Sequence, residues 1–258
     1  MVVKHIQRKL QDKSEKHTEA LRKLGLLAAK VELPANVHVM PPTPQFVGMN
    51  TVLQDPATEH VDFVFYFDRL ASILIEKFAP RSPSMVPILI ADVHRFCRAL
   101  DMTTYVQTTV ETPNGNRYLG FHPKGSVSAV AILRGGSCLE TALKRTIPDC
   151  VTGRLLIQTD VSSSEPELHY LKLPPQLEEH SMVMLLDPQM ASGGAALMAV
   201  RVLIDHGVLE ENIVFVTCAA GETGIKRLVA VFPKINVVVG RIEADGEPRW
   251  MERRYFGC

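Results

Sequence analysis

The sequence predicts an α/β fold in which helices cover both faces of a parallel sheet. Three observations support this prediction: short apolar runs recur through the second half of the chain, helical patterns separate most of them, and two of them end in a glycine pair. Nearly continuous apolar strands are typical of parallel sheets because both of their faces are buried. Hydrophobic residues make up 46% of the chain and charged residues 22%, as in ordinary globular proteins.

The first 40 residues predict a helical extension that leads into a linker. Val3, Ile6 and Leu10 recur at helical spacing, and a similar leucine pattern follows them. Acidic residues interleave with the basic ones, which favours a solvated helix face over a membrane-binding one. The prolines between residues 34 and 44 then favour extended backbone. We therefore predict an extension at residues 1–40 and the main domain at 41–258.

The elements of the main domain follow from hydrophobic periodicity. Residues 61–78 predict an amphipathic helix whose apolar side chains share one face, and residues 84–108 predict a further helical segment. The apolar runs predict strands at 127–133, 153–158, 182–186, 213–217 and 235–239. The patterns between them predict helices at 139–146, 195–206 and 224–231.

Charge and cysteine content argue against several classes of function. Lysine and arginine together number 28, and aspartate and glutamate together also number 28, so the formal net charge is zero. A zero net charge favours neither nucleic acid nor a membrane as partner. The five cysteines show no C-x-x-C spacing, which favours reduced thiols in a cytoplasmic protein. We recognise no secretory signal and no apolar run long enough to span a bilayer, so we expect a soluble protein.

The loops that follow the predicted strands are the candidate site, because ligands of open α/β sheets bind beyond the carboxyl ends of the strands. The loops ILRGGS (132–137) and DPQMASGG (187–194) each hold a glycine pair, and CAAGETG (218–224) follows a third strand. Neither a G-x-x-x-x-G-K-[ST] nor a G-x-G-x-x-G motif occurs in the sequence. Their absence argues against ordinary nucleoside triphosphatases and dinucleotide-binding proteins.

The second of these loops has the chemistry of a sugar-phosphate site. The unpaired N–H groups at the start of a helix and the positive end of its dipole suit a phosphate, and Gly193 and Gly194 allow close approach. Ser192 adds a hydroxyl donor, while Asp187 can accept hydrogen bonds from two vicinal ribose hydroxyls. The alternatives are a plain tight turn at the glycines and a helix cap at Asp187 near Gln189.

Arg134 stands at the end of a predicted buried strand, where a guanidinium requires an anionic partner. Beside a glycine pair, its planar fork and the exposed backbone N–H groups suit a pyrophosphate. An ion pair with Glu140, one helical turn away, is the structural alternative. Together the two loops predict a substrate that bears a phosphate and a pyrophosphate on a ribose.

These residues resemble those of the uracil phosphoribosyltransferases. D-P-x-x-A-[TS]-G-G at 187–194 is similar to that family's motif for 5-phosphoribosyl 1-pyrophosphate (PRPP), and I-L-R-[AG]-G at 132–136 is similar to its pyrophosphate loop. The similarity also includes residues 43–63, 153–174 and 254–257. The chain most resembles the uracil phosphoribosyltransferase-like half that follows a kinase in uridine-cytidine kinase-like proteins. The resemblance implies a type I phosphoribosyltransferase-like parallel sheet with flanking helices.

The resemblance implies a reaction in which uracil and PRPP give UMP and pyrophosphate, in pyrimidine salvage. Asp187 and Arg134 would be the catalytic residues, with Asp187 on the ribose hydroxyls and Arg134 on the leaving pyrophosphate. Mg²⁺ would arrive bound to PRPP, no metal site of the protein is implied, and members of the family form homo-oligomers. The residues implied to bind PRPP are Arg134, Gly135, Gly136, Asp187, Pro188, Ala191, Ser192, Gly193, Gly194 and Ala195. The residues implied on the base side are Asp245, Arg254, Phe256 and Gly257.

The segment before the last residues departs from the family. Between Asp245 and Arg254 the family's uracil-binding P-G-x-G loop is missing and the segment is shorter. Three hypotheses follow: a uracil phosphoribosyltransferase, a transferase that reads another base through Arg249 or Trp250, and a domain that binds PRPP or nucleotide without transfer. The last would serve as the regulatory or scaffolding half of a uridine kinase, which makes a uridine kinase a further candidate partner.

Overall fold

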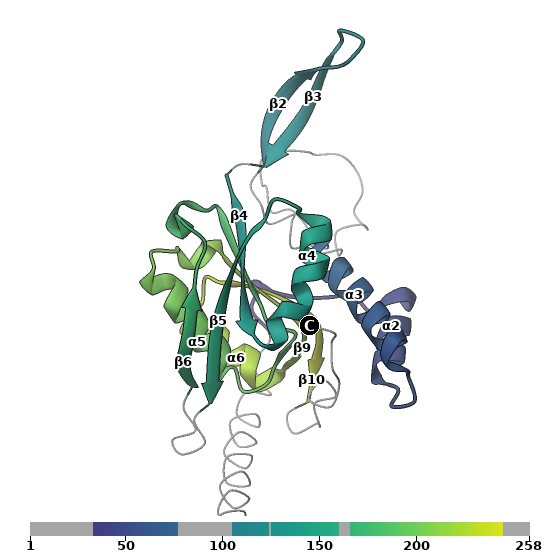
Figure 1. Cartoon of the computed structure of the whole chain (residues 1–258), viewed down its shortest axis with the longest axis vertical. Helices are drawn as coiled ribbons and strands as arrows, with labels where there is room; N and C mark the ends of the chain where they lie inside the picture. The colour runs from purple at the N-terminus through teal and green to yellow at the C-terminus, as the bar shows by residue number, and fades with distance from the viewer. Residues whose placement is uncertain (1–32, 77–104, 124, 160–165, 245–258) are drawn as a thin grey trace, which may run out of the picture.

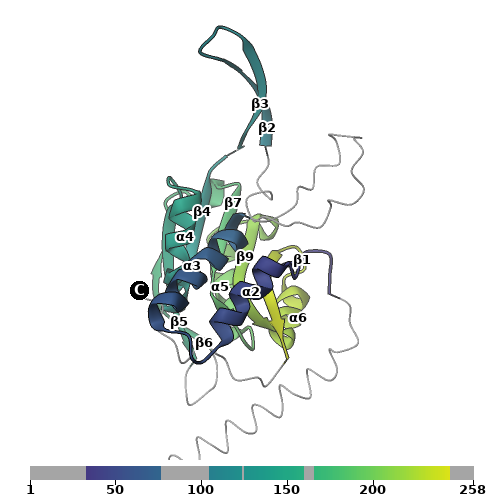
Figure 2. The ribbon, with the colours of Figure 1, turned by 90° about the vertical axis from the view of Figure 1, so that its right-hand side faces the viewer.

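An eight-stranded sheet stands between two layers of helices in the computed structural model, which describes residues 33–76, 105–123, 125–159 and 166–244 (Figures 1 and 2). The strand order is β1-β10-β9-β7-β4-β5-β6, and the short strand β8 also pairs with β9. Every pair is parallel except β5 with β6, which is antiparallel. The predicted α/β fold with a parallel sheet and flanking helices is therefore confirmed.

The described elements include every strand predicted from the apolar runs. The strands of the sheet are β1 (Val37–Val39), β4 (Val127–Leu133), β5 (Val151–Thr159), β6 (Pro166–Lys172), β7 (Met182–Leu186), β8 (Gln189–Met190), β9 (Ile213–Gly221) and β10 (Asn236–Glu243). The helices are α2 (Pro44–Gln54), α3 (His60–Glu76), α4 (Glu140–Thr146), α5 (Gly194–Asp205) and α6 (Glu222–Val231), with short 3₁₀ turns at η2 (Gly135–Leu139), η3 (Leu177–Glu179) and η4 (Glu210–Asn212). None of the helices in the described ranges is long and apolar enough to cross a membrane.

The sheet separates two apolar cores, which explains why its central strands are apolar at nearly every position. On one side α2, α3 and α4 pack with Met184 and Leu186 of β7, and on the other α5 and α6 pack with Val183 and Leu185 (Figure 2). Successive side chains of a strand point to opposite faces, so each central strand contributes to both cores. A strand that is buried in this way has no solvent-facing position for a polar residue.

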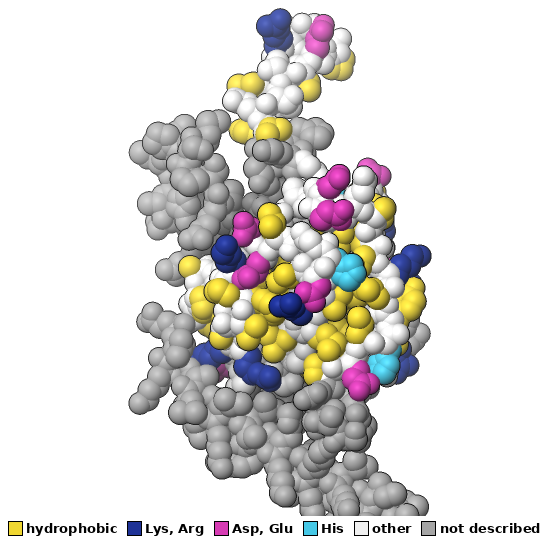
Figure 3. Space-filling model, turned by 90° about the vertical axis from the view of Figure 1, so that its left-hand side faces the viewer, with side chains coloured by type: hydrophobic (Ala, Val, Ile, Leu, Met, Phe, Trp, Pro, Cys, Tyr) yellow, Lys and Arg dark blue, Asp and Glu magenta, His cyan; other side chains and the backbone are white. Residues whose placement is uncertain are grey.

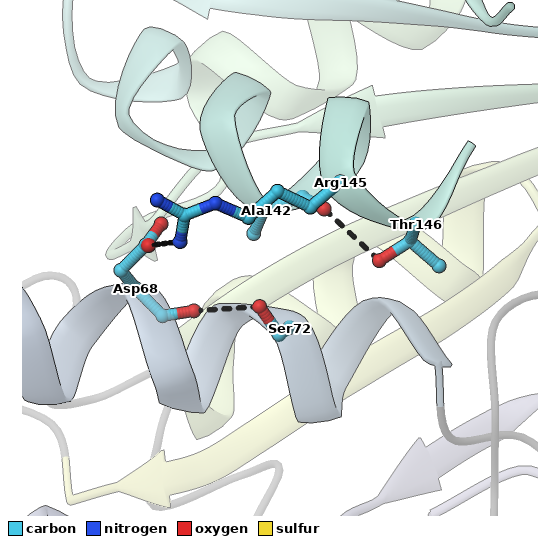
Figure 4. Close-up of polar contacts among 5 residues, drawn as sticks. All are labelled: Asp68, Ser72, Ala142, Arg145 and Thr146. Carbon is cyan, nitrogen blue, oxygen red and sulfur yellow. Dashed lines mark hydrogen bonds and ion pairs between the residues drawn. The ribbon is translucent and has the colours of Figure 1, made fainter. Parts of the chain in front are cut away.

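Helix α3 confirms the helix predicted at 61–78 and holds α4 in place. Phe63 and Phe67 are buried against each other, with ring centroids 6.4 Å apart. Arg145 of α4 forms an ion pair with Asp68 of α3, and Ser72 Oγ donates to the Asp68 carbonyl oxygen at 2.9 Å (Figure 4). Because α4 follows the turn at the end of β4, this contact also fixes the segment that leads out of the candidate pyrophosphate loop.

A strand and a helix occupy the region where the prolines predict only an extended connector. β1 pairs in parallel with β10, so residues 37–39 belong to the sheet. Helix α2 begins at Pro44, and Thr43 Oγ1 accepts a hydrogen bond from Phe46 N at 3.2 Å. Proline is favoured at a helix start because the first N–H groups have no intrahelical partner, and Pro44 is the first residue of α2. Residues 1–32, with the predicted N-terminal helices, lie outside the described residues.

A two-stranded hairpin stands away from the sheet and consists of β2 (Tyr105–Glu111) and β3 (Arg117–Pro123) (Figures 1 and 3). It corrects the end of the helix predicted at 84–108, whose earlier residues up to 104 lie outside the described residues. Val106, Thr108, Thr109 and Val110 are β-branched residues, which favour a strand here. Gly115 has a φ of 77°, which suits a tight turn between antiparallel strands.

Replacing Phe63 by alanine should lower the free energy of unfolding by about 3–5 kcal/mol, because it empties a fully buried site between α3 and the sheet. The matched control is Phe65→Ala on the same helix, where 57% of the residue is exposed and the loss should stay below about 1 kcal/mol. Urea denaturation followed by circular dichroism measures both values. Equal losses for the two variants would contradict this packing.

Candidate functional site

Two loops meet at the carboxyl end of the sheet, one after β4 and one after β7. These strands are adjacent and parallel, so the segments that follow them leave the sheet at the same edge. A Cβ atom on Gly136 would lie 2.3 Å from the carbonyl oxygen of Leu186, and one on Gly135 would lie 3.1 Å from Cγ of Pro188. Only a hydrogen fits at Gly136. The two loops that the sequence predicts as one site therefore lie in contact.

Arg134 lies in the turn between β4 and η2, and it is exposed. The peptide bond that precedes it is cis. The ion pair with Glu140, the structural alternative, is not formed: Glu140 instead accepts hydrogen bonds from Arg154 at 3.0 and 3.2 Å, which raise the pKa of Arg154. Within the described ranges no side chain forms a hydrogen bond or ion pair with the Arg134 guanidinium. This cation is accessible to an anionic ligand.

Asp187 begins the second loop directly after β7 and is partly exposed. Its backbone N–H donates to the Val216 carbonyl oxygen at 3.1 Å, and Gln189 N donates to Asp187 Oδ1 at 3.4 Å. This is a local turn contact and not a helix cap, because α5 begins only at Gly194. Burial and, secondly, the negative charge of Asp187 raise the pKa of the Cys218 thiol, so this thiol stays protonated.

The glycine pair gives α5 an open N-terminus. Gly193 is the N-cap residue, has a φ of 78° and provides no side-chain cap. Leu197 N donates to the Gly193 carbonyl oxygen at 2.8 Å, so the N–H groups before Leu197 in the first turn have no intrahelical partner. Gly194 and Ala195 are partly exposed. These N–H groups, with the positive end of the helix dipole, can receive a phosphate.

The third predicted loop, CAAGETG at 218–224, is not a loop. β9 continues to Gly221 and α6 begins at Glu222, so the chain passes from strand to helix without an intervening segment. Ala219 and Ala220 pair with both β8 and β10. This pairing extends the strand beyond the apolar run from which its end was predicted.

Helix α6 packs against the glycine loop through Gly224 and Arg227, which the sequence did not predict as site residues. A Cβ atom on Gly224 would lie 2.1 Å from the Ala191 carbonyl oxygen. Arg227 Nη1 donates to the Ser192 carbonyl oxygen at 2.7 Å. The only sequence signal for this contact is a glycine and an arginine one turn apart at the start of a predicted helix. Both contacts hold the loop in front of α5.

The residues implied on the base side lie outside the described residues. They are Asp245, Arg254, Phe256 and Gly257, and the alternative base contacts Arg249 and Trp250 lie outside as well. No group of three or more histidine, cysteine or carboxylate side chains lies together as a metal site in the ranges that the structure covers.

A polar cluster at the end of β10 was also missed. Arg241 forms an ion pair with Glu243, and Gln189 Nε2 donates to Glu243 Oε2 at 3.4 Å. Arg241 also lines a cavity of about 800 Å³ between α2 and the ends of β1 and β10, whose walls include Met40 and Phe46. The cluster joins the loop that contains Asp187 to this cavity.

Comparison with known proteins gives one consistent family. The profile described as uracil phosphoribosyltransferase matches residues 88–247. The uracil phosphoribosyltransferase of Dictyostelium discoideum is 34% identical over 82% of this chain and 88% of its own length. The uridine kinase of Saccharomyces cerevisiae is 34% identical over the whole of this chain, which spans 50% of that protein's length.

A solved structure has the same fold. The AQ2163 protein from Aquifex aeolicus superposes with a TM-score of 0.61 and 20% identity, over 81% of this chain and 88% of that protein. At this level of identity the likeness concerns the fold alone.

Replacing Gly224 by alanine should push the glycine loop away from α6, because the added methyl would meet the Ala191 carbonyl oxygen. The free energy of unfolding should fall by about 1–3 kcal/mol. The control is Gly48→Ala in α2, where the new Cβ meets open space and should stabilise the helix by about 0.5–1 kcal/mol. Thermal unfolding compares the variants, and a Gly224→Ala protein as stable as the control would refute the contact.

Proposed function

This chain belongs to the uracil phosphoribosyltransferase family, and we propose that it transfers ribose 5-phosphate from PRPP to uracil in pyrimidine salvage. One observation carries the proposal: Gly136 places the Arg134 loop in contact with the carbonyl end of β7, where Asp187 follows. A pyrophosphate on the first loop and a ribose 5-phosphate on the second can then belong to one substrate. We expect the reaction to take place in the cytoplasm.

The described residues would act by orientation and by charge. Asp187 would accept hydrogen bonds from the ribose hydroxyls, while the open N-terminus of α5 receives the 5-phosphate. The bond between C1 and the pyrophosphate oxygen breaks, uracil N1 forms the new bond to C1, and the N1 proton leaves. Arg134, with the backbone N–H groups of Gly135 and Gly136, would stabilise the charge that develops on pyrophosphate.

Mg²⁺ would enter with PRPP, bound to its pyrophosphate oxygens. Magnesium in phosphoryl sites is commonly held by one or two carboxylates together with substrate phosphates. The two loops fit this arrangement, because Asp187 offers a partly exposed carboxylate beside the candidate pyrophosphate loop.

A second candidate function is a domain that binds PRPP or nucleotide without transfer and regulates a uridine kinase. Two observations favour it. The whole chain matches uridine kinases, including that of Saccharomyces cerevisiae and uridine-cytidine kinase A of Dictyostelium discoideum, of which it spans about half. The family's uracil-binding loop is also missing between residues 245 and 254.

We further propose that the β2–β3 hairpin joins copies of this chain into a homo-oligomer. A hairpin of two strands is marginally stable alone in water. Tyr118, Leu119 and Phe121 are each 61% exposed and lie on both of its faces, while Glu111 pairs with Arg117 near the tip. Hydrophobic side chains are visible on the hairpin in Figure 3. A second copy would cover these side chains, and a chain of zero net charge does not repel its copy.

Asp187→Asn should weaken PRPP binding at least about tenfold, because it removes the charged acceptor for the ribose hydroxyls. The control is Asp205→Asn, an exposed aspartate paired with Arg201 at the other end of α5, which should bind PRPP like wild type. Isothermal calorimetry with PRPP and Mg²⁺ measures affinity, and chromatography after addition of uracil measures UMP. PRPP binding without UMP formation would support the second candidate, and no PRPP binding would overturn both.

Replacing Tyr118 and Phe121 together by serine should reduce the mass in solution to that of one chain, 28.6 kDa. The apolar surface that copies would share is lost, while the sheet remains intact. Light scattering after size-exclusion chromatography measures the mass. Leu209→Ser, an exposed apolar position away from the hairpin, is the control. An unchanged mass in the double variant would show that the hairpin does not join copies.

A further inference from the structure

The strand order determines the side from which a base reaches the ribose. β7, which leads to Asp187, lies between β4 and β9 in the sheet. The candidate pyrophosphate loop follows β4, so the leaving group occupies that side. In an inverting displacement at a sugar carbon, the nucleophile approaches the face opposite the leaving group. The base must therefore enter from the side of β9 and β10.

Three polar side chains form a row that runs from β8, on the β7 edge of β9, across to that side. Gln189 of β8 and Arg241 of β10 both pair in register with Ala219 of β9, so they flank this alanine at one level across three strands. Their Cα atoms are about 10 Å apart at ordinary strand spacing, and the side chain of Ala219 between them is a single methyl group. Glu243, two residues beyond Arg241, lies on the same face of β10.

The hydrogen bonds within this row place Glu243, the acceptor, between two donors, Gln189 and Arg241. Gln189 Nε2 donates to Glu243 Oε2 at 3.4 Å, and Arg241 Nη2 donates to Glu243 Oε1. Glu243 is 9% exposed and the Arg241 side chain 36% exposed, while Gln189 is partly exposed. An ionised carboxylate has about four acceptor positions, so these two bonds leave it able to accept a further donor.

We propose that Gln189, Glu243 and Arg241 read the edge of the base. Uracil presents O2, N3–H and O4, which are acceptor, donor and acceptor, and this order complements the row. Cytosine presents an acceptor at N3, which would face the Glu243 carboxylate without a shared hydrogen. A site whose polar groups form hydrogen bonds with one base edge binds a second base more weakly when that base leaves these groups unpaired. The proposal rests on the proposed function, because Asp187 and its loop must hold the ribose 5-phosphate.

This row would replace the family's missing base loop. The apolar walls of the neighbouring cavity, which includes Met40, Phe46 and Ile242, offer surfaces against which a planar ring can pack. Arg241 belongs to both the row and the cavity lining. In this proposal the base is recognised by side chains of β8 and β10.

Product nucleotides test the proposal separately from catalysis. Calorimetry of the full chain with UMP, CMP and N3-methyl-UMP should show UMP bound at least about tenfold more tightly than the other two. Glu243→Ala should abolish this preference while the affinity for ribose 5-phosphate is unchanged. Gln189→Met, which keeps the side-chain length, should lower UMP affinity about tenfold. Glu179→Ala, at an exposed glutamate away from the row, is the control.

The outcomes distinguish this inference from the transferase proposal. Equal affinities of the three nucleotides for the wild-type protein, or a UMP preference that survives in Glu243→Ala and Gln189→Met, would overturn the role of the row. A preference that depends on Glu243, in a protein that forms no UMP from uracil and PRPP, would support the row and reject the transferase. If no nucleotide binds, both proposals fail.

Discussion

Close approach of backbone segments at the carboxyl end of the sheet holds the candidate site together. At Gly136 the loop after β4 lies against the last carbonyl of β7, and at Gly224 helix α6 lies against the carbonyl of Ala191. A backbone contact has no side-chain rotamers through which to adjust, so it positions its partners more closely than most side-chain contacts. The exposed guanidinium of Arg134, the carboxylate of Asp187 and the start of α5 share this frame.

The parts of the fold that the sequence predicts are those with a local cause. Strands β4, β7 and β9 are apolar because both faces are buried, and that pattern is visible without knowledge of their neighbours. Helix α2 was missed because Pro44 has opposite effects at a helix start and in a helix interior. The β2–β3 hairpin has apolar side chains on both of its exposed faces. Its sequence therefore lacks the alternation of apolar and polar residues that distinguishes a half-buried strand from a helix.

The same distinction between local and long-range causes applies to the residues of the candidate site. Asp187, the glycines after it and Arg134 belong to short motifs whose chemistry can be read locally. Arg227 meets the glycine loop and Gln189 meets Glu243 only after the strands are ordered, across 35 and 54 positions of sequence. No periodicity or spacing connects residues so far apart. The row of Gln189, Glu243 and Arg241 could therefore not be predicted before the register of β8, β9 and β10 was known.

The short strand β1 has a consequence for the behaviour of the protein in solution. It has only three residues, and it pairs with the outer side of β10, the strand that contains Arg241 and Glu243. An uncovered strand edge is a template to which another chain can add by hydrogen bonding, and a very short outer strand leaves little length for such addition. β1 therefore protects against edge-to-edge aggregation. A truncated protein that began at residue 41 would expose β10 as an edge open to intermolecular β-addition.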